Sequence, residues 1–542
     1  MLIESIEKEL KNRFPQVDFD FSLSRLPQID LESNIFFVLQ DKEKLGLEEL
    51  KSKYEKDLED ILSKFGMDKK DFEISSSGFL NINLSPEVLK RELKNILDKK
   101  ENYFRSHDLN GKKINLEFVS ANPTGPLHLG NLRGGPTGEV LTNLLKQRGA
   151  KVIKEYYVND LGTQTERFAK SVIFHKISDE KKYRFPEDGY KGNYPKQIAQ
   201  KLGNEEVSNF ISGKIDEKQL IDVLRRPIMN LVLKEIKNNL KELKISFDNF
   251  IFESSLVDET KFILSQLKEK KVVKEREGAL WFSSPKHKEL LGDRECVLIR
   301  SDGKPTYFLY DIAYHINKFK RGFDFVIDIW GANHFGHAPR IWAALEILDY
   351  SRENLKIIFY QPVSLKKGSK ALMMSKRQGS YITVSELLEG IDKDIFKVYL
   401  LEKILNSPID FDPDQFEKEK KESLAFYLKY MSARINGIFE KVKEPKGEAD
   451  FSDLDQSAIK LIKKILFLDY MAYRTTEILE PHLFYNEAMA LVETFHSFYE
   501  KNPIKNEKDE KIKKARFEIL KATNTALQFS SKMLGIDLPK KM

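Results

Sequence analysis

Apolar runs bounded by glycine mark a strand–helix–strand unit in the first third of the chain. Residues 114–119 form an apolar stretch that predicts a short buried strand, and a loop rich in glycine and proline follows at 120–130. Apolar residues then recur with helical spacing until Gly149, and residues 151–158 predict the next strand. Two strands joined through a helix form a βαβ unit, which predicts parallel pairing in a doubly wound sheet.

The second half of this sheet comes much later in the chain. Residues 323–330 and 355–360 predict strands, and a helical pattern at residues 339–348 lies between them. The intervening region, about residues 165–295, is therefore expected to be an insertion, and its pattern is mostly helical.

Different patterns flank the sheet on either side. Residues 78–84 alternate as a strand does and residues 85–100 carry a helical pattern, whereas the chain from Asp392 to the end is helical with no further strand pairs. We therefore expect a multidomain α/β protein. Its parts would be an appended N-terminal α+β domain (1–108), a Rossmann-like parallel-sheet domain with a helical insertion (109–390) and a C-terminal all-α domain (391–542).

The amino-acid composition excludes a few kinds of protein but does not indicate one function. The 542 residues include 90 Lys and Arg against 84 Asp and Glu, a net charge of +6, which permits a polyanionic partner without requiring one. Cys296 is the single cysteine, so an intramolecular disulfide and a cysteine-rich zinc site are excluded. No run of about 18 apolar residues occurs, and the charged N-terminus lacks the apolar core of a signal peptide. We expect no membrane span and a cytoplasmic location.

The loop after the first strand carries the first candidate chemistry. Ligands of an open α/β sheet bind beyond the carboxyl ends of the strands, where a helix N-terminus offers N–H groups to a phosphate. His128 can donate a hydrogen bond to a phosphate oxygen, Asn131 adds a neutral donor, and Gly130 lets the backbone approach a nucleotide closely. From these residues alone, a turn with an ordinary surface histidine is an equally good interpretation.

A short phrase in this loop resembles a known signature. His128-Leu129-Gly130-Asn131 resembles the HIGH motif of the class I aminoacyl-tRNA synthetases, and the wider run 117–131, with Ala-Asn-Pro-Thr-Gly-Pro-Leu-His, resembles the arginyl branch of that family. The last histidine of the motif is Asn131 here, which keeps a hydrogen-bond donor but cannot become cationic. The resemblance extends from residue 114 to the end, and the first domain fits the module that this family places against the tRNA elbow.

A second signature of the family, the KMSKS loop, corresponds to residues 373–377. Met373 replaces its first lysine, whereas Lys376 is present and would stabilise the negative charge that grows as pyrophosphate leaves. Members that lack this lysine carry a lysine three residues before the first histidine of the HIGH motif. That position is Gly125 here, so Gly125 and Lys376 both indicate the subtype that uses the lysine of the KMSKS loop. On its own, a Ser-Lys-Arg sequence is more often a solvated loop. Residues 383–386 then predict a capping box.

The resemblance implies several groups of site residues. Catalytic roles are expected for His128, Gly130, Asn131 and Lys376. ATP is expected to bind at Pro123, Thr124, Gly125, His128, Gly130, Asn131, Gly331, Asn333, His334, Met374, Ser375 and Lys376. Arginine is expected to bind at Glu117, Ser120, Asn122, Tyr307 and Asp311, and tRNA at Tyr427, Tyr430, Arg434 and Met542. No residues are expected to form a metal site.

The chemistry of these side chains fits the implied ligands. A guanidinium presents five N–H donors in a planar fork, so a selective pocket needs carboxylates such as Glu117 and Asp311. Tyr307 and Asp311 are four apart and share a face if the stretch is helical, although without the resemblance a surface pair is the preferred interpretation. The family usually has aspartate at Asn333, so the contacts of Asn333 stay open. The tyrosines at 427 and 430 can stack on bases, but packing inside a helical core is nearly as good an interpretation.

The resemblance also implies a reaction. L-arginine is activated by ATP to arginyl-adenylate and transferred to the 3′ end of tRNA(Arg), with release of pyrophosphate and AMP. Mg²⁺ would accompany ATP, held by phosphates and water rather than by a protein cage. The family is usually monomeric and generally needs bound tRNA before it activates arginine. Two alternatives stay open: another class I nucleotidyl-transfer enzyme, or a tRNA-binding protein that has lost catalysis. Glu117 with Asp311 argues against the first, and His128, Gly130 and Lys376 argue against the second.

Overall fold

The chain divides into two units. The computed structural model describes residues 2–284, 295–367, 370–372, 383–451 and 454–541. Residues Met1–His107 and Leu424–Met542 form one unit, and residues Asp108–Ser423 form the other. Within the described part of the chain, none of the helices is both long and apolar enough to cross a membrane.

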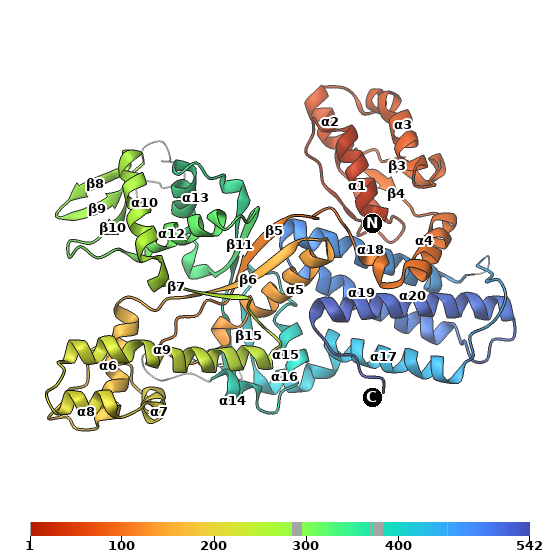
Figure 1. Ribbon diagram of the computed structural model, residues 1–542. Coiled ribbons are helices and arrows are strands. Elements are labelled where there is room, and N and C mark those ends of the chain that lie inside the picture. Colours follow the sequence, from red (N-terminus) through yellow and green to blue (C-terminus); the bar gives the residue numbers. More distant parts are fainter. Residues whose placement is uncertain (1, 285–294, 368–369, 373–382, 452–453, 542) are drawn as a thin grey trace. The chain divides into compact units, whose positions relative to one another are not determined.

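A five-stranded parallel sheet with the order β12-β11-β5-β6-β7 organises the unit of residues 108–423 (Figure 1). Its strands are β5 (Lys113–Glu117), β6 (Lys151–Val158), β7 (Asn249–Phe252), β11 (Phe325–Gly331) and β12 (Leu355–Tyr360). The parallel pairing that the βαβ pattern predicts is confirmed, and β6 and β12 have the bounds that their apolar runs predict. Strands buried in a parallel sheet carry continuous apolar runs, which is why they stand out in the sequence.

The order of the strands defines where a ligand can bind. β5 and β11 are neighbours, but the chain leaves them in opposite directions: it passes through α5 (Gly134–Gln147) to β6, and through α13 (Ala338–Ile347) to β12. Ligands of open α/β sheets bind beyond the carboxyl ends of the strands at such a switch point. The loops that follow β5 and β11 therefore lie at the same edge of the sheet.

The region between β6 and β11 is less uniformly helical than its pattern predicts. It contains the helices α6 (Thr163–Ile177), α7 (Tyr194–Lys201), α8 (Glu205–Ile211), α9 (Glu217–Glu242), α10 (Val257–Glu269) and α12 (Tyr307–Lys320). However, β7 extends the parallel sheet beside β6, and β8 (Val273–Arg276), β9 (Ala279–Phe282) and β10 (Cys296–Ile299) form a separate antiparallel sheet. Each of these strands has four residues, too few for a two-residue period to emerge. Cys296, the first residue of β10, is buried.

One strand lies where the sequence predicts only helices. β15 (Ile409–Phe411) pairs in parallel with β13 (Val363–Lys367), which also pairs with β14 (Lys370–Leu372). The expectation of no further strand pairs after Asp392 is therefore wrong. Three residues become a strand here because of a partner more than 40 positions away, which no local pattern reveals. The neighbouring helices are α14 (Val384–Leu388), α15 (Lys393–Tyr399) and α16 (Pro413–Glu419).

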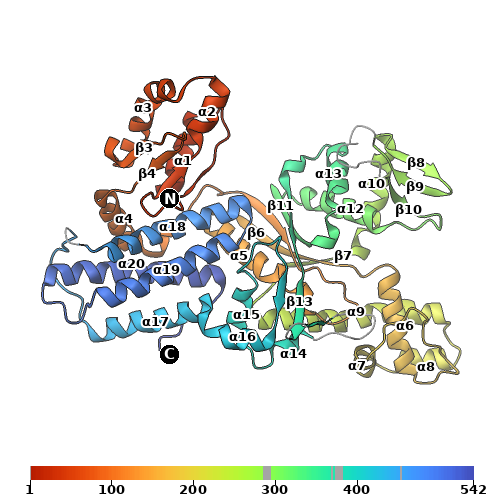
Figure 2. The ribbon, with the colours of Figure 1, turned by 180° about the vertical axis from the view of Figure 1, so that it is seen from behind.

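The other unit combines a small sheet with long helices. Its antiparallel sheet has the order β1-β2-β4-β3, with strands Phe21–Leu23, Leu31–Ser33, Leu80–Ile82 and Phe72–Ile74 in that order. The first four helices are α1 (Leu2–Arg13), α2 (Ile35–Glu43), α3 (Leu47–Ser63) and α4 (Pro86–Lys99). The C-terminal helices lie side by side (Figure 1 and Figure 2): α17 (Leu424–Lys441), α18 (Gln456–Ile478), α19 (His482–Lys501) and α20 (Glu510–Leu534).

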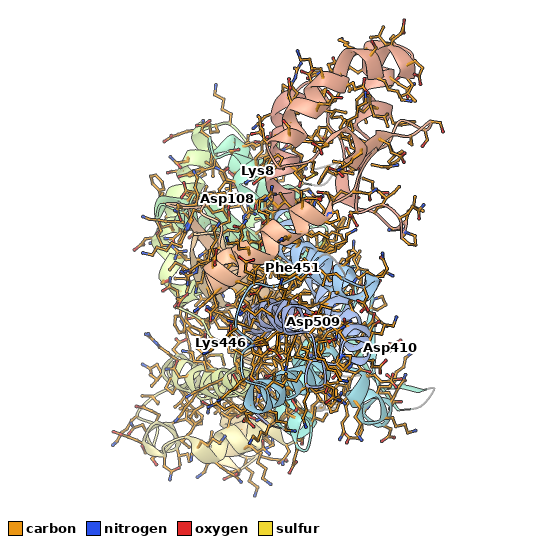
Figure 3. All side chains as sticks on the ribbon, turned by 90° about the vertical axis from the view of Figure 1, so that its right-hand side faces the viewer. Lys8, Asp108, Asp410, Lys446, Phe451 and Asp509 are labelled. Atoms are coloured by element: carbon orange, nitrogen blue, oxygen red, sulfur yellow. The ribbon has the colours of Figure 1, made fainter. Side chains whose placement is uncertain are left out.

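Polar contacts join the first and last parts of this unit. The Tyr470 hydroxyl on α18 lies 2.9 Å from both the Glu7 carboxylate and the Phe21 carbonyl. Lys8, labelled in Figure 3, places its ammonium 5.3 Å from the centre of the Tyr473 ring. The N-terminal α+β segment therefore packs on α18 through buried, satisfied polar groups.

Candidate active site

The chain leaves β5 through a sharp turn. Val119 and Ser120 have φ values of 68° and 36°, a left-handed conformation that is unfavourable for a branched valine and persists only where the surroundings enforce it. A Cβ atom at Gly138 would lie 2.4 Å from the ring of Phe118, so glycine lets α5 approach this turn closely. The loop that follows is thereby held at the carboxyl edge of the sheet.

His128 lies at the end of this loop, directly before a 3-10 turn at Leu129–Asn131. α5 begins only at Gly134, so the HIGH-like residues precede the α-helix rather than open it. A Cβ atom at Gly130 would approach the His128 ring to 3.2 Å, so glycine leaves room for the imidazole. The remaining predicted ATP ligands of this loop are buried beside it: Pro123, Thr124 and Gly125.

Thr383 connects the two signatures. It forms an isolated antiparallel bridge with His128, and the Val384 N–H donates to the Leu127 carbonyl at 3.1 Å. Thr383 and Glu386 form the predicted capping box at the start of α14. Residues 373–382, which include Met374, Ser375 and Lys376, lie outside the described residues. Since Thr383 follows them directly, the chain returns from the second signature beside His128.

Glu117 and Ser120 form one group of the predicted arginine-binding residues. Glu117, the last residue of β5, is 5% exposed and accepts hydrogen bonds from Ser120 Oγ at 2.8 Å and Lys318 Nζ at 2.7 Å. Ser120 Oγ also accepts from the Tyr157 N–H at 3.0 Å. Asn122 is exposed in the same loop.

Tyr307 and Asp311 form a second group on the first turns of α12. The stretch is helical, so the two side chains share a face as their spacing predicts. His337 Nε2 lies 2.6 Å from Asp311 Oδ2, and the ring centres of His337 and Tyr307 are 5.6 Å apart. Tyr307 is 60% exposed, which leaves its ring accessible to a ligand.

Tyr157 links these two groups and is not singled out by the sequence. Its hydroxyl donates to Glu253 Oε2 at 2.9 Å. Burial raises the pKa of Tyr157 well above its usual value, and the charges of Glu253, Asp311 and Glu117 raise it further. The negative charges of three carboxylates from different elements therefore act on this phenol, and Glu253 is the one in contact with it.

Glu253 is a second residue that the sequence does not reveal. It follows β7 directly and is 4% exposed. Burial raises its pKa to about 7, the Tyr157 hydroxyl opposes this shift, and Asp311 and Asp160 add to it. A desolvated acid with a pKa near neutrality is a candidate functional group. The sequence feature that could identify Glu253 is an acid at the carboxyl end of an apolar run. This feature indicates a site residue only once residues 249–252 are known to pair with β6.

Buried charges beneath the site attach α12 to the sheet. Lys318 Nζ donates to Glu117 and to Asp328 at 2.7 Å each, and His315 Nε2 lies 2.7 Å from the other oxygen of Asp328. Burial alone would lower the pKa of Lys318, but the charges of Asp328, Glu117 and Glu155 outweigh it and raise that pKa. Glu117 is therefore already paired with an internal cation.

The loop after β11 carries the remaining described residues predicted to contact ATP. Gly331, Asn333 and His334 lie at the carboxyl end of β11, the strand next to β5. A Cβ atom at Gly331 would lie 2.7 Å from Asn333 Oδ1, so a side chain there would displace the amide. Burial lowers the pKa of His334, which favours its neutral form.

The predicted tRNA-binding residues meet partners from α19. Tyr430 stacks on His496 with ring centres 5.8 Å apart, and Tyr427 meets the same imidazole edge-on at 5.8 Å. The Arg434 guanidinium lies 4.6 Å from the Tyr430 ring centre and 4.9 Å from that of Tyr499. All five side chains are half-buried, so each presents part of its surface to solvent. His496 and Tyr499 are found only through the packing of α19 on α17, and Met542 lies outside the described residues.

Two family models match the chain. The model for "tRNA synthetases class I (R), catalytic domain" matches residues 92–412, and that for "DALR anticodon binding domain" matches residues 428–542. The chain is 34% identical to the arginine–tRNA ligase of Aquifex aeolicus over 95% of this chain and 94% of that protein. It is 31% identical to the arginine–tRNA ligase of Thermotoga maritima over 100% of both. The arginyl-tRNA synthetase structure of Thermus thermophilus matches with a TM-score of 0.75, covering 100% of this chain and 99% of that one. At 18% identity, this likeness concerns the fold alone.

Proposed function

The chain belongs to the arginyl-tRNA synthetases, ligases that join arginine to tRNA with ATP, and we propose how its residues divide that chemistry. The observation that carries the proposal is that residues 92–412, matched by the class I catalytic model, contain both the switch point of the sheet and the two signature loops. The nucleotide and the amino acid would therefore meet beyond the carboxyl ends of β5 and β11.

ATP binds between the two signature loops in this proposal. His128 and Asn131 donate to its phosphates, with Gly130 and the buried segment 123–125 giving the backbone close access. Gly331, Asn333 and His334 line the ribose and adenine, and Lys376, with Met374 and Ser375, closes on the phosphates from the second loop. The bridge between His128 and Thr383 supports this arrangement, because it brings the end of the second loop to the first.

Mg²⁺ would accompany the nucleotide without a dedicated protein site. Among the residues that the structure describes, no group of three or more His, Cys, Asp or Glu side chains is placed to hold a metal ion. Phosphate oxygens and water are the ligands that Mg²⁺ keeps in such sites.

The guanidinium of arginine enters a pocket of carboxylates. We assign its recognition to Asp311 and Glu253, with Tyr307 over the side chain and Asn122 at the backbone end of the substrate. Glu117 and Ser120 shape the floor of the pocket, because Lys318 and Tyr157 already engage them. Asp311 and Glu253 raise the pKa of the same tyrosine, Tyr157, which supports their facing one ligand.

The reaction then proceeds in two steps. The arginine carboxylate attacks the α-phosphorus of ATP in line, and pyrophosphate leaves. The terminal ribose hydroxyl of tRNA next attacks the activated carbonyl, and AMP leaves. The protein contributes positioning and charge stabilisation rather than covalent chemistry.

tRNA(Arg) is the macromolecular partner of this proposal. Tyr427, Tyr430 and Arg434, with His496 and Tyr499, offer stacking surfaces to unpaired anticodon bases, and the 3′ end of the tRNA must be splayed into the catalytic crevice. We further propose that bound tRNA is needed for arginine activation, that the protein acts as a monomer, and that it works in the cytoplasm. The single buried cysteine is compatible with a reducing compartment.

ATP–pyrophosphate exchange tests the whole assignment. The exchange is measured with each amino acid, with and without total tRNA, beside a His128→Ala variant. We expect exchange with arginine, only in the presence of tRNA, and its loss in the variant. Exchange with another amino acid would contradict the pocket assignment. Binding of tRNA without any exchange would indicate a protein that has lost catalysis.

A further inference from the structure

Arg133 is fully buried one residue before α5, and backbone carbonyls surround its guanidinium. Its Nη1 group donates to the carbonyls of Gln361 and Leu405 at 3.1 Å each and to that of Ser407, and its Nη2 group donates to those of Lys403 at 3.0 Å and Ile404 at 2.8 Å. Hydrogen bonds from an ionised donor are stronger than neutral ones, and a buried charge needs such partners. One side chain therefore joins the end of the first signature loop to two distant segments.

The two segments that Arg133 holds lead toward the second signature. Gln361 lies between β12 and β13, and the chain continues through β13 and β14 into residues 373–382. Residues 403–407 lead into β15, which pairs with β13. The Gln361 N–H also donates to the Leu405 carbonyl at 2.9 Å. The two segments are therefore hydrogen-bonded to each other at the same residues whose carbonyls accept from Arg133.

The other end of the same stretch is attached to the first loop as well. Leu127 and His128 bond to Val384 and Thr383, directly after residues 373–382. Residues 361–384 therefore contact the first signature loop at both ends: at Arg133 on entry, and at Leu127 and His128 on return. One anchor lies at the first of the HIGH-like residues, His128, and the other lies two residues after the last of them, Asn131.

We propose that Arg133 is a positioning residue for the nucleotide, which holds Gln361 and residues 403–407 in place against the loop that carries His128. The inference rests on the proposed binding of ATP between the two signature loops. Arg133 itself is buried and does not touch substrate. It acts by fixing the geometry of two loops, and reaction rates are sensitive to errors of about 1 Å in such geometry.

A lysine cannot reproduce this arrangement. The guanidinium spreads its donors over a rigid planar fork that reaches five carbonyls, whereas an ammonium is a compact point charge with three donors. Arg133→Lys keeps the buried charge, but its ammonium cannot reach all five carbonyls. Arg133→Gln is a second variant, in which the side chain is neutral. Arg148 offers a matched control, because it is also buried, follows the other end of α5, and bonds to Asp108 instead of the signature segments.

The test measures exchange kinetics with tRNA present, together with thermal melting and the shift in melting temperature that ATP produces. Arg133→Lys should lower turnover, or raise the KM for ATP, by about 10²-fold and abolish the ATP-induced shift, while the KM for arginine stays unchanged. Arg148→Lys should lower the melting temperature alone. The proposal is overturned if both Arg133 variants behave like Arg148→Lys. It is also overturned if the KM for ATP and the KM for arginine rise to the same extent in both variants.

A reference variant separates this inference from the assignment on which it rests. If His128→Ala leaves exchange intact, the placement of ATP between the loops is wrong, whatever Arg133 does. If His128→Ala abolishes exchange while the Arg133 variants keep normal ATP kinetics, the nucleotide assignment stands and the positioning role of Arg133 is wrong.

Discussion

Arginine binding should displace a proton from Glu253, so the affinity for arginine should rise as the pH passes through neutrality. Burial raises the pKa of Glu253 to about 7, and its ionised form is the one that pairs with a guanidinium. The sign follows from this raised pKa. Below pH 7 the carboxyl holds its proton and the cation must displace it, whereas above pH 7 the carboxylate is already available.

The size of the effect follows from the same pKa. With a value of about 7, the ionised fraction is about one tenth at pH 6 and about nine tenths at pH 8. When only the ionised form accepts the ligand, the apparent dissociation constant scales inversely with this fraction, so it should fall roughly tenfold between these pH values. Glu253→Gln removes the titrating group but keeps an acceptor for the Tyr157 hydroxyl, and should flatten the profile.

Calorimetric titration with arginine at pH 6, 7 and 8 measures both quantities. Repeating it in two buffers of different ionisation enthalpy counts the protons released, which should be about half a proton at pH 7. Asp258→Asn is the matched control, since it removes an exposed acid from the neighbouring helix α10. The reasoning is refuted if Glu253→Gln retains the pH dependence, or if the unaltered protein releases no proton.

The same carboxyl should also cost stability, which gives an independent check. Its pKa in the folded state is about 7, against an ordinary value of 4.5, so the folded state binds more protons than the unfolded state between these values. Stability therefore falls as the pH rises through this window, by about 3 kcal/mol in total. Glu253→Gln should melt at a higher temperature than the unaltered protein at pH 8, and at nearly the same temperature at pH 4.5.

Three further predictions address the other assignments. Asp311→Asn should weaken arginine binding by about 2 kcal/mol, because it removes a charge that faces the guanidinium; an equal loss of ATP affinity would mean that Asp311 is structural. Tyr430→Ala and His496→Ala should each weaken tRNA binding by about 1–3 kcal/mol, read from charging against tRNA concentration; a large fall in melting temperature with normal tRNA affinity would assign both to the helical core. Lys376→Ala should slow exchange by about 10²–10³-fold with little change in arginine affinity, and Gly125→Lys in that background should restore part of the rate; a near-normal rate for the single variant would make the loop a mere surface feature.

The central sheet could be predicted because its strands carry their own signal. Strands β6 and β12 are buried in a parallel sheet, so their apolar runs are continuous and end at recognisable turns. The HIGH-like residues could be recognised for a similar reason, since His128 and Gly130 lie in one contiguous loop.

The rest of the fold depends on partners that are distant in the sequence. β7 and β15 have only four and three residues, and each becomes a strand by pairing with an element far along the chain. The same limit applies to the site. Glu253 becomes a candidate only when β7 joins the sheet, and Arg133 acquires a role only when five carbonyls from elsewhere surround it.

In the proposed site, the charges of the surrounding acids would suit an arginine substrate. The acids beneath the crevice already have cations of their own: Lys318 lies between Glu117 and Asp328, and Arg321 bonds to both oxygens of Glu155. Asp311 and Glu253 meet only a histidine and a tyrosine among their hydrogen-bond partners in the described structure. Glu253 is a desolvated carboxylate whose hydrogen-bond partner in the described structure is a phenol, which is unfavourable unless a ligand supplies a cation, and its raised pKa reflects that deficit. Arginine would supply that cation as a fork of donors, whereas a neutral amino acid of similar size would leave Glu253 without one. Selectivity for arginine would then arise because the part of the protein that the structure describes provides no cation of its own for this acid, as well as from the contacts that the protein makes with the substrate.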